Sequence, residues 1–244
     1  MDHVAWRDNV QLLSSRQIGT AAWRHAFVAD APANDCLVSD QSREANYVFP
    51  LWQYPPKGSR KENLSPDFRA FLDARYAHHY APEEVLGYLY AVLHAPSYRS
   101  RYADFLRIDF PRIPFAQKRK HFDALSALGW ALVQAHLLRD CPHRGFAQYA
   151  GKGDHSVESV VWGEADQRIH INKTQSFGPV PETVWRFTIG GYQVLDKYLK
   201  SRKGRRLSLD EINHLGQVAD SLAFTIDQMA LIDKAWANAF PDRG

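Results

Sequence analysis

The sequence of 244 residues is poor in several features that would place it in a common class of proteins. It has two cysteines, Cys36 and Cys141, which are too few for a disulfide framework, so we expect a reduced, cytoplasmic protein. It has no apolar run of about 18 residues, and we therefore expect no membrane span. Its first residues, MDHVAWRDNV, lack the basic and apolar segments of a signal peptide.

The known signatures of nucleotide and acyl-transfer enzymes are also missing. There is no G-x-x-x-x-G-K-[ST] phosphate-binding loop and no G-x-G-x-x-G fingerprint after a predicted strand. There is no G-x-S-x-G nucleophile elbow. The F-x-G-x-G and N-P-P-[YF] motifs of an amino-methyltransferase are absent as well. We therefore predict that this chain carries no catalytic residues.

A metal site is not expected either. His136, Cys141 and His143 lie close together in the sequence, and His78 adjoins His79. A zinc site needs four ligands in paired short spacings, and the second pair is missing here. We expect these side chains to be structural. An enzyme of unrecognised type, with His78, His79 or His136 in a cleft, is the alternative.

The residues that are present predict an α+β fold, with a helical scaffold and small, mostly antiparallel β elements in the N-terminal and central regions. We expect a single domain over residues 1–244. Its predicted portions are strand and loop over 1–62, helices over 63–140, strands over 150–192 and C-terminal helices over 193–244.

Short runs rich in β-branched and aromatic residues predict the first strands. They are HAFVAD (25–30), CLVSD (36–40) and YVFPLWQY (47–54). Pro50 cannot donate a backbone hydrogen bond, so the third run is expected at a sheet edge or a bulge.

Proline and capping residues predict where the first helices begin. Ser65 followed by Pro66 is typical of an N-cap and a first helical position, and Pro82 begins a second helix in the same way. We expect a third helix from Pro96 to about Arg107 and a fourth from about Lys118 to Leu138.

The second half of the chain also predicts strands followed by helices. SVESVVWG (156–163), RIHIN (168–172) and WRFTIG (185–190) predict strands. The sequence YQVLDKYLKSR (192–202) predicts a helix that ends at Gly204. Ser208 and Glu211 form the pattern of a capping box for the last helix. Its apolar positions predict core packing, with an oligomer interface as the alternative; they are Ile212, Leu215, Ala219, Leu222, Ile226 and Met229.

The formal net charge is only +3, but the positive charge is concentrated in three segments. The strongest is KYLKSRKGRR (197–206), which contains no acid. It follows a helix, where one or two cations would complement the helix dipole, and six exceed that need. Such a run suits the phosphates of a nucleic acid, and a solvated helix end is the alternative. The basic candidates are Lys197, Lys200, Arg202, Lys203, Arg205 and Arg206; Arg112, Lys118, Arg119 and Lys120; and Lys57, Arg60 and Lys61.

Two polar turns are candidates for reading base edges, because Arg, Lys, Asn and Gln side chains form the specific contacts in DNA grooves. INKTQSFG contributes Asn172, Lys173 and Gln175, and SSRQ contributes Arg16 and Gln17. An ordinary polar turn is the alternative for each.

The stretch YRSRYADFLRIDFPRIPF (98–115) predicts a rigid connector between two helices. Its apolar residues are expected on one face of a short helix, so that Arg99 and Arg101 are only solvated. Pro111 and Pro114 must end that helix. Only Arg112 at its end stays a DNA candidate. The residues placed on one face are Tyr98, Tyr102, Phe105 and Leu106.

Long segments of the chain resemble the C-terminal target-recognition domain of type ISP restriction–modification enzymes and their N6-adenine methyltransferase relatives. They are YLYAVLHAPSYRSRYADFLRIDFPRIPF, LGWALVQAHLL, FTIGGYQVLDKYLKSRKGRRLS and TIDQMALID, in family order. In that family a nuclease, a helicase-like ATPase and a methyltransferase precede this domain. The resemblance implies that the domain reads duplex DNA, and that S-adenosylmethionine binds the methyltransferase rather than this chain.

We therefore predict a non-catalytic domain for sequence-specific recognition of double-stranded DNA in a restriction–modification system. Its expected partners are the methyltransferase and the helicase–nuclease parts of such a system, and no membrane. The chain could be a fragment, the product of a truncated gene or a separate specificity subunit. The alternative is an interaction module that docks on a methyltransferase or helicase without reading DNA.

Overall fold

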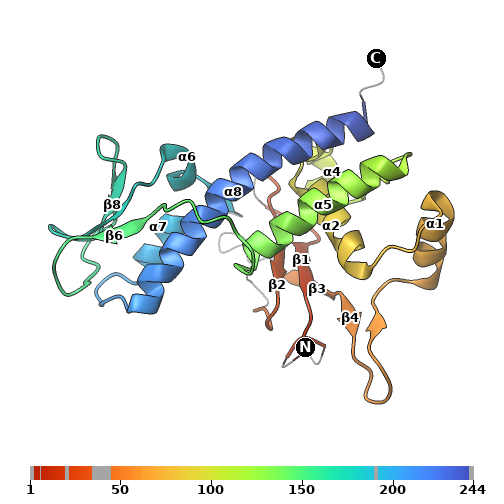
Figure 1. The fold of residues 1–244 in the computed structure, drawn as a ribbon, viewed down its shortest axis with the longest axis horizontal. Helices are drawn as coiled ribbons and strands as arrows, with labels where there is room; N and C mark the ends of the chain where they lie inside the picture. Colours follow the sequence, from red (N-terminus) through yellow and green to blue (C-terminus); the bar gives the residue numbers. More distant parts are fainter. Residues whose placement is uncertain (1–2, 6, 20–21, 35–44, 190–191, 242–244) are drawn as a thin grey trace. The chain divides into compact units, whose positions relative to one another are not determined.

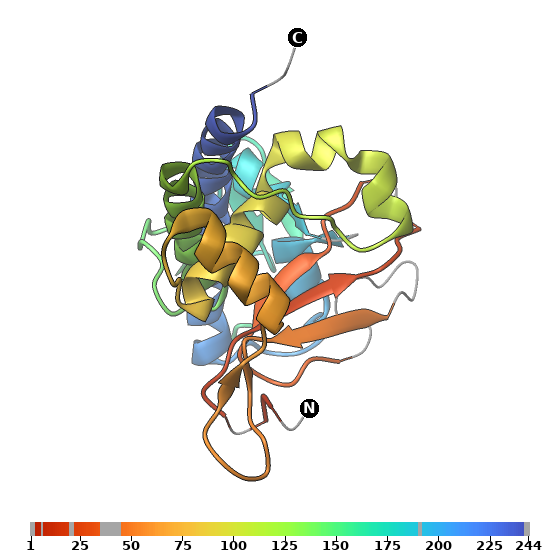
Figure 2. The same cartoon turned by 90° about the vertical axis from the view of Figure 1, so that its right-hand side faces the viewer.

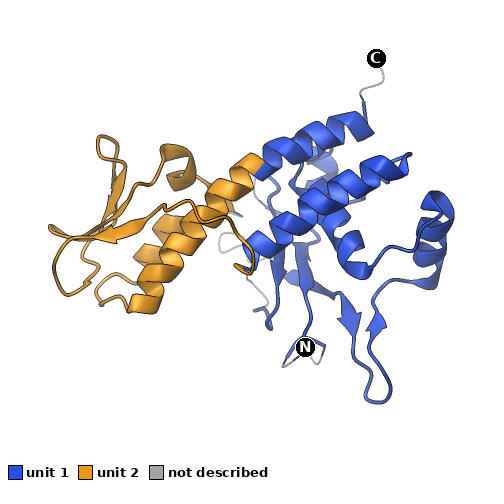
Figure 3. Cartoon of the chain, in the orientation of Figure 1, with its two compact units in different colours: residues 1–137, 228–244 blue, residues 138–227 orange. Residues whose placement is uncertain are grey.

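The computed structural model describes residues 3–5, 7–19, 22–34, 45–189 and 192–241 (Figure 1). Helices and small antiparallel sheets make up the predicted α+β fold. The chain divides into two compact units (Figure 3). Unit 1 comprises residues 1–137 and 228–244, and unit 2 comprises residues 138–227. No helix among the described residues is both long and apolar enough to cross a membrane.

Unit 1 contains a three-stranded antiparallel sheet in the order β2–β1–β3. The strands are β1 (Gln11–Ser15), β2 (Ala26–Ala29) and β3 (Asn46–Pro50). The central strand β1 was not predicted, whereas the expected edge position of Pro50 is confirmed, because β3 pairs only with β1 among the described strands. The predicted strand 36–40 lies outside the described residues.

Two helices of unit 1 cross in direct backbone contact. They are α2 (Pro82–His94) and α5 (Arg119–His136). A Cβ built on Gly129 would lie 1.9 Å from the carbonyl oxygen of Gly87, so only glycine allows the helices this approach. The surrounding core is largely aromatic: the Tyr88 ring stacks on Phe122 with 4.3 Å between centroids. This helix pair forms the scaffold that the sequence predicts.

The predicted helix starts at proline are confirmed. In α1 (Pro66–Tyr76), the Ser65 hydroxyl accepts a hydrogen bond from the N–H of Phe68 at 3.3 Å. The hairpin β4 (Trp52–Gln53) and β5 (Lys61–Glu62) precedes this helix and protrudes at the bottom of the view in Figure 2. Arg69 of α1 donates to Glu62 of the hairpin at 3.0 Å. The predicted boundary at residue 62 therefore falls inside unit 1.

The connector differs from its prediction. The expected single helix is two short ones, α3 (Pro96–Arg101) and α4 (Ala103–Ile108), because the backbone of Tyr102 leaves the helical region at φ −113° and ψ 21°. This break turns Phe105 outward, with 66% of it exposed, so the predicted common apolar face is wrong for this residue.

Arg99 is also not merely solvated. Its Nε donates to the carbonyl oxygen of Leu93 at 2.6 Å, and its guanidinium lies over the Trp23 ring at 5.7 Å. Burial lowers the pKa of Arg99 to about 10. Arg99 therefore has a structural role in unit 1.

Unit 2 contains a four-stranded antiparallel sheet in the order β6–β9–β8–β7. The strands are β6 (Gln148–Ala150), β7 (Val161–Gly163), β8 (Arg168–His170) and β9 (Ser176–Gly178). Only the last three residues of the predicted strand 156–163 are in β7. Strands β6 and β9 were not expected: each has only three residues, and β6 pairs with β9, which is distant from it in sequence.

In the rest of unit 2, one predicted strand and one predicted helix have different boundaries in the structure. Trp185 ends the short helix α6 (Glu182–Trp185), and only Thr188–Ile189 of the predicted strand 185–190 form β10. Tyr192–Gln193 form β11, so the predicted helix 192–202 begins later, as α7 (Val194–Lys200). The glycines at 190 and 191 lie outside the described residues.

The last helix, α8 (Leu209–Ala239), supplies its first part to unit 2 and its last part to unit 1. The predicted capping box is confirmed: the Glu211 N–H donates to the Ser208 hydroxyl at 3.1 Å, and the Ser208 N–H donates to the Glu211 carboxylate at 3.0 Å. Four residues of the predicted apolar stripe are buried in the unit 2 core, which supports core packing for them. They are Ile212, Leu215, Ala219 and Leu222.

Candidate nucleic-acid interface

The basic run of unit 2 begins in α7 and continues, after Lys200, as an exposed loop that is bonded to a neighbouring segment. Gly204, at φ +84°, makes the turn after α7. Its N–H donates to the carbonyl oxygen of Val157 at 2.9 Å, and the N–H of Val157 donates to the carbonyl oxygen of Arg205 at 3.0 Å. Ser156 pairs with Arg206 in an isolated β-bridge. The loop therefore has a defined backbone path rather than being a loose helix end.

Two of its arginines hold a carboxylate. Arg202 donates to Glu211 at 2.9 Å, and Arg205 donates to the same carboxylate at 2.6 Å and 2.9 Å. Hydrogen bonding to Arg205 and to the Ser208 N–H lowers the pKa of Glu211 to about 2. The guanidinium of Arg202 also lies 3.5 Å from the centroid of the Tyr198 ring. These two arginines are committed to contacts that stabilise the start of α8.

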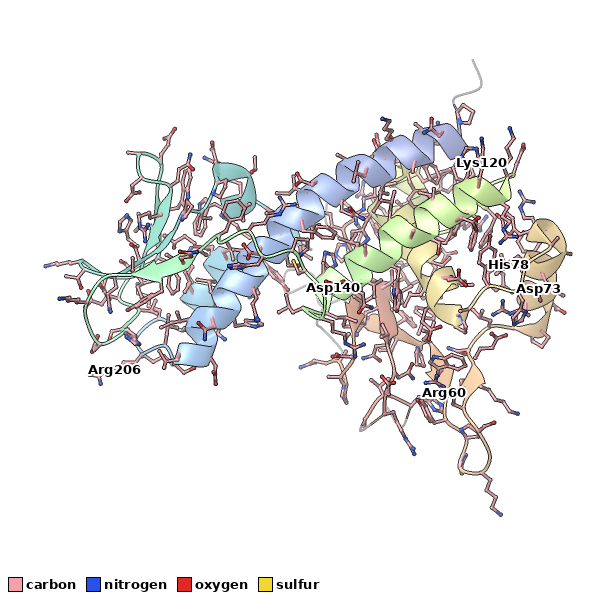
Figure 4. All side chains as sticks on the ribbon, in the orientation of Figure 1. Arg60, Asp73, His78, Lys120, Asp140 and Arg206 are labelled. Atoms are coloured by element: carbon pink, nitrogen blue, oxygen red, sulfur yellow. The ribbon has the colours of Figure 1, made fainter. Side chains whose placement is uncertain are left out.

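Acids near the run in space neutralise further cations. Lys200 pairs with Asp196 at 2.8 Å. Arg206, labelled in Figure 4, pairs with Asp154 at 2.9 Å. Lys197 lies 4.7 Å from the centroid of the Tyr192 ring. Lys203 is exposed and has no ion pair with any residue that the structure describes. The run keeps a net positive charge, but less than its sequence indicates.

The predicted base-reading turn at 172–175 is held largely by its own side chains. The Asn172 oxygen accepts from the N–H groups of Thr174 and Gln175 at 3.0 Å and 2.8 Å. Only 2% of Gln175 is exposed, and both ends of its amide are hydrogen-bonded. This geometry favours the polar-turn alternative for Asn172 and Gln175. Lys173, between them in sequence, is exposed.

A third loop, residues 151–156, lies against this turn and adds a cation that the sequence analysis missed. A Cβ on Gly151, at φ +104°, would lie 1.9 Å from the carbonyl oxygen of Thr174. Lys152 follows at once and is exposed. Asn172 donates to the carbonyl oxygen of Ser156 at 2.8 Å, so the same loop contacts the turn again. The pattern G-K-G was the available signal: a lysine between two glycines indicates an exposed turn.

The candidates of unit 1 fall into separate groups. Arg16 pairs with Asp109 at 3.1 Å, and Gln17 beside it is exposed. In the hairpin, Lys57 and Lys61 are exposed, and the Arg60 guanidinium lies 4.2 Å from the centroid of the Trp52 ring.

At the start of α5, Lys118 and Lys120 are exposed and Arg119 lies 3.5 Å from Asp123. Arg112 is exposed on the connector. Arg60 and Lys120 lie well apart in Figure 4, with Asp73 and His78 between them in this view. The basic hairpin and the start of α5 are therefore separate within unit 1.

His136 and His79, two of the candidate histidines, each contact another side chain. The Tyr90 hydroxyl lies 2.6 Å from Nδ1 of His136, and burial lowers the pKa of His136 to about 4. His79 contacts Asp73 at 2.9 Å and lowers the pKa of that carboxylate. No group of three His, Cys, Asp or Glu side chains among the described residues could hold a metal ion.

Asp220 in unit 2 holds the loop that contains His143. Only 3% of Asp220 is exposed, and its carboxylate accepts from the N–H groups of Arg144 and Phe146 at 3.0 Å and 2.9 Å. The His143 ring contacts the same carboxylate at 2.8 Å. The N–H of Gly145 also donates to it, at 3.4 Å, and three backbone donors on one buried carboxylate are the pattern of a structural anchor.

Unit 1 also exposes apolar surface around two cavities. One cavity, of about 450 Å³, lies between α2 and the sheet, and another, of about 530 Å³, adjoins α3 and α4. Phe110 lines both, and its ring packs edge-on against Tyr47 at 4.9 Å. Phe105 and Ile108, the latter 63% exposed, lie beside the second cavity.

A family model described as "Type ISP C-terminal specificity domain" matches residues 1–231. The chain belongs to this family. The match covers both compact units and nearly the whole chain. It confirms the resemblance that the sequence segments indicate. No curated protein matches the chain.

Three solved structures show the same fold. A nuclease-deletion mutant of the Type ISP restriction-modification enzyme LlaGI, in complex with a DNA substrate mimic, is 19% identical, with a TM-score of 0.67 over 93% of this chain. The ATP-dependent Type ISP enzyme LlaBIII bound to DNA is 14% identical, with a TM-score of 0.70 over 93%. The DrdV–DNA complex is 20% identical, with a TM-score of 0.69 over 97%. This specificity domain spans only 18%, 16% and 25% of those chains, respectively.

Proposed function

We propose that this specificity domain recognises a particular sequence in double-stranded DNA for a restriction–modification system. The observation that carries the proposal is the family match over residues 1–231. The three similar structures were all solved with DNA or a DNA mimic, which supports the same ligand class here.

The loops of unit 2 supply the chemistry that such binding needs. Exposed cations on a fixed backbone hold phosphates and set the register on the duplex, while base edges are read by other polar groups. Lys173 and Lys203 are exposed on such loops. Arg202 and Arg205 are held by Glu211 and are weaker candidates than the sequence indicates. Unit 1 offers further phosphate contacts at Lys120 and in the basic hairpin.

Selection from a pool of randomised duplexes tests the proposal. The full chain is incubated with the pool at about 0.15 M salt, and bound duplexes are sequenced over successive rounds. We expect one sequence motif to be enriched. Binding without any enrichment, or no retention of duplex, would contradict sequence-specific recognition.

We further propose that the chain is non-catalytic and that S-adenosylmethionine binds a methyltransferase part of the system. The absence of the motifs for the methyl donor and the target base supports this assignment. An assay with radiolabelled methyl donor and the selected duplex should give no transfer by this chain alone. Turnover without a second protein would overturn it.

The exposed apolar surface of unit 1 supports a second role, docking on a methyltransferase or helicase partner. Aromatic residues with arginine nearby are typical of protein interfaces, and Arg112 lines the same cavity as Phe105. The similar chains are four to six times longer than the part that this fold covers, so a contact within a larger protein is expected there.

A matched pair of variants tests this docking. Phe105→Ser removes an exposed ring beside the cavity, whereas Leu231→Ser removes an exposed leucine elsewhere in unit 1. With a methyltransferase of the same system, we expect Phe105→Ser to weaken association about tenfold or more and Leu231→Ser to have no effect. Equal association of both variants and the wild type would exclude this surface.

A further inference from the structure

The amide of Gln175 joins the backbone loops of unit 2 that carry exposed lysines. Its Oε1 accepts from the His155 N–H at 3.1 Å and from the Asn172 side chain at 2.8 Å. Its Nε2 donates to the Tyr149 hydroxyl. The backbone of Gly153 lies against the same amide, since a Cβ there would be 2.7 Å from its Cδ. A buried amide with this many partners fixes the loops 151–156 and 171–175 relative to each other.

The loop 201–207 is attached to the same two loops. Ser156 accepts a hydrogen bond from Asn172 at its carbonyl oxygen and pairs with Arg206 in the isolated bridge. The N–H of Gly204 donates to Val157, the residue after Ser156. The loop 201–207 is therefore positioned by the segment that Gln175 holds.

Each of these three loops carries one exposed lysine next to a contact residue. Lys152 follows Gly151, Lys173 follows Asn172, and Lys203 precedes Gly204. None of the three has an ion pair with a residue that the structure describes, in contrast to Arg202, Arg205 and Arg206. Cations that are not neutralised by carboxylates are the ones that release counterions when they meet a phosphate.

We propose that Gln175 is a positioning residue that aligns Lys152, Lys173 and Lys203 against the phosphates of a DNA backbone. This inference rests on the proposed DNA recognition and assigns part of its binding surface. It replaces the predicted role of Gln175 as a base reader, and it adds Lys152, which lies outside the three basic segments of the sequence. The paired arginines shape the loop, and the three lysines contact the DNA.

The experiment measures how the dissociation constant for the selected duplex depends on salt. For each of Lys152→Gln, Lys173→Gln and Lys203→Gln in the full chain, we expect the slope of log affinity against log salt to fall by about 0.9. Arg186→Gln is the matched control, because Arg186 is an exposed cation of unit 2 that pairs with Glu182 at 2.6 Å. It should leave the slope unchanged.

Gln175→Leu tests the positioning role. We expect it to lower the slope with all three lysines present, and further lysine substitutions in that background should have little additional effect. A merely structural role would reduce the fraction of folded protein without changing the slope. Tyr149→Phe is a milder variant for the case in which Gln175→Leu fails to fold: it removes only the hydroxyl that accepts from Gln175, and its slope should fall less.

The outcomes separate the two proposals. If the wild-type chain binds no duplex, the proposed function fails and this inference fails with it. If the wild type binds but the three lysine variants keep its slope, only the inference is wrong. A wild-type slope in both Gln175→Leu and Tyr149→Phe would likewise contradict the positioning role.

Discussion

Replacing Glu211 by glutamine removes the charge that holds Arg202 and Arg205 but keeps an oxygen that can accept from the Ser208 N–H. The pKa of Glu211 falls from 4.5 to about 2 in the folded chain. If fully realised, a difference of that size would correspond to about 3 kcal/mol of folding free energy. Solvent screening reduces it, because half of the Arg205 side chain is exposed. We expect Glu211→Gln to lower the free energy of unfolding by about 1–2 kcal/mol at pH 7.

The direction of the pKa shift determines how the stabilisation by Glu211 depends on pH. Because the pKa of Glu211 is lower in the folded chain than in the unfolded one, its contribution is full above about pH 4.5 and is lost as the pH falls toward about 2. The difference between wild type and Glu211→Gln should therefore narrow over that range. Glu211→Ala also loses the cap and should cost about 1 kcal/mol more than Glu211→Gln at pH 7.

Urea denaturation of the three proteins at pH 7 and pH 3.5 measures these differences. Glu182→Gln is the control, since Glu182 pairs with Arg186 at the surface and should contribute at most about 0.5 kcal/mol. Equal stability of Glu211→Gln and wild type at pH 7, or a difference that does not change with pH, would refute the conclusion that the contacts of Glu211 with Arg202 and Arg205 stabilise the start of α8.

Two further predictions concern the packing of each unit. Gly129→Ala should lower the free energy of unfolding, measured in urea, by about 1–3 kcal/mol, because its Cβ would meet backbone atoms of α2. Gly216→Ala is the control and should be neutral or stabilising, since the atom nearest to its Cβ would be 3.6 Å away. A larger loss for Gly216→Ala than for Gly129→Ala would contradict the close contact of the two helices. Asp220→Asn should lower the free energy of unfolding by about 2–3 kcal/mol in the same assay, because the N–H groups of Arg144 and Phe146 lose the carboxylate that accepts from them. His143→Ala, at an exposed side chain, is the comparison. A loss of stability in Asp220→Asn no larger than that in His143→Ala would exclude the anchor role of Asp220.

Local signals predicted the helices well. The starts of α1 and α2 follow from Pro66 and Pro82, and the capping box at Ser208 and Glu211 needs only residues three positions apart. The central strand β1 was missed because QLLSS has weak strand character, and its two partners are supplied by residues 26–29 and 46–50. The break between α3 and α4 at Tyr102 was not predicted, because no proline or glycine lies there.

The candidate site was predicted less completely, because its electrostatics depend on distant residues. Asp154, which pairs with Arg206, lies 52 positions before it in the sequence, so the residues around the basic run do not reveal this ion pair. Gln175 was a candidate base reader in sequence, yet its amide is buried against Tyr149 of β6 and against Gly153 of the loop 151–156. The exposure of Lys173 and Lys203 is consistent with their selection as candidates, but DNA contact by either one stays a prediction.

The most direct measurement is the affinity of the chain for a set of duplexes that differ from the selected sequence by one base pair each. Fluorescence anisotropy at a fixed salt concentration of about 0.15 M gives the dissociation constants. Sequence recognition predicts that substitutions at the positions read by the domain cost about 1–3 kcal/mol each, while flanking positions are neutral. Equal affinity for every duplex in the set would contradict the account.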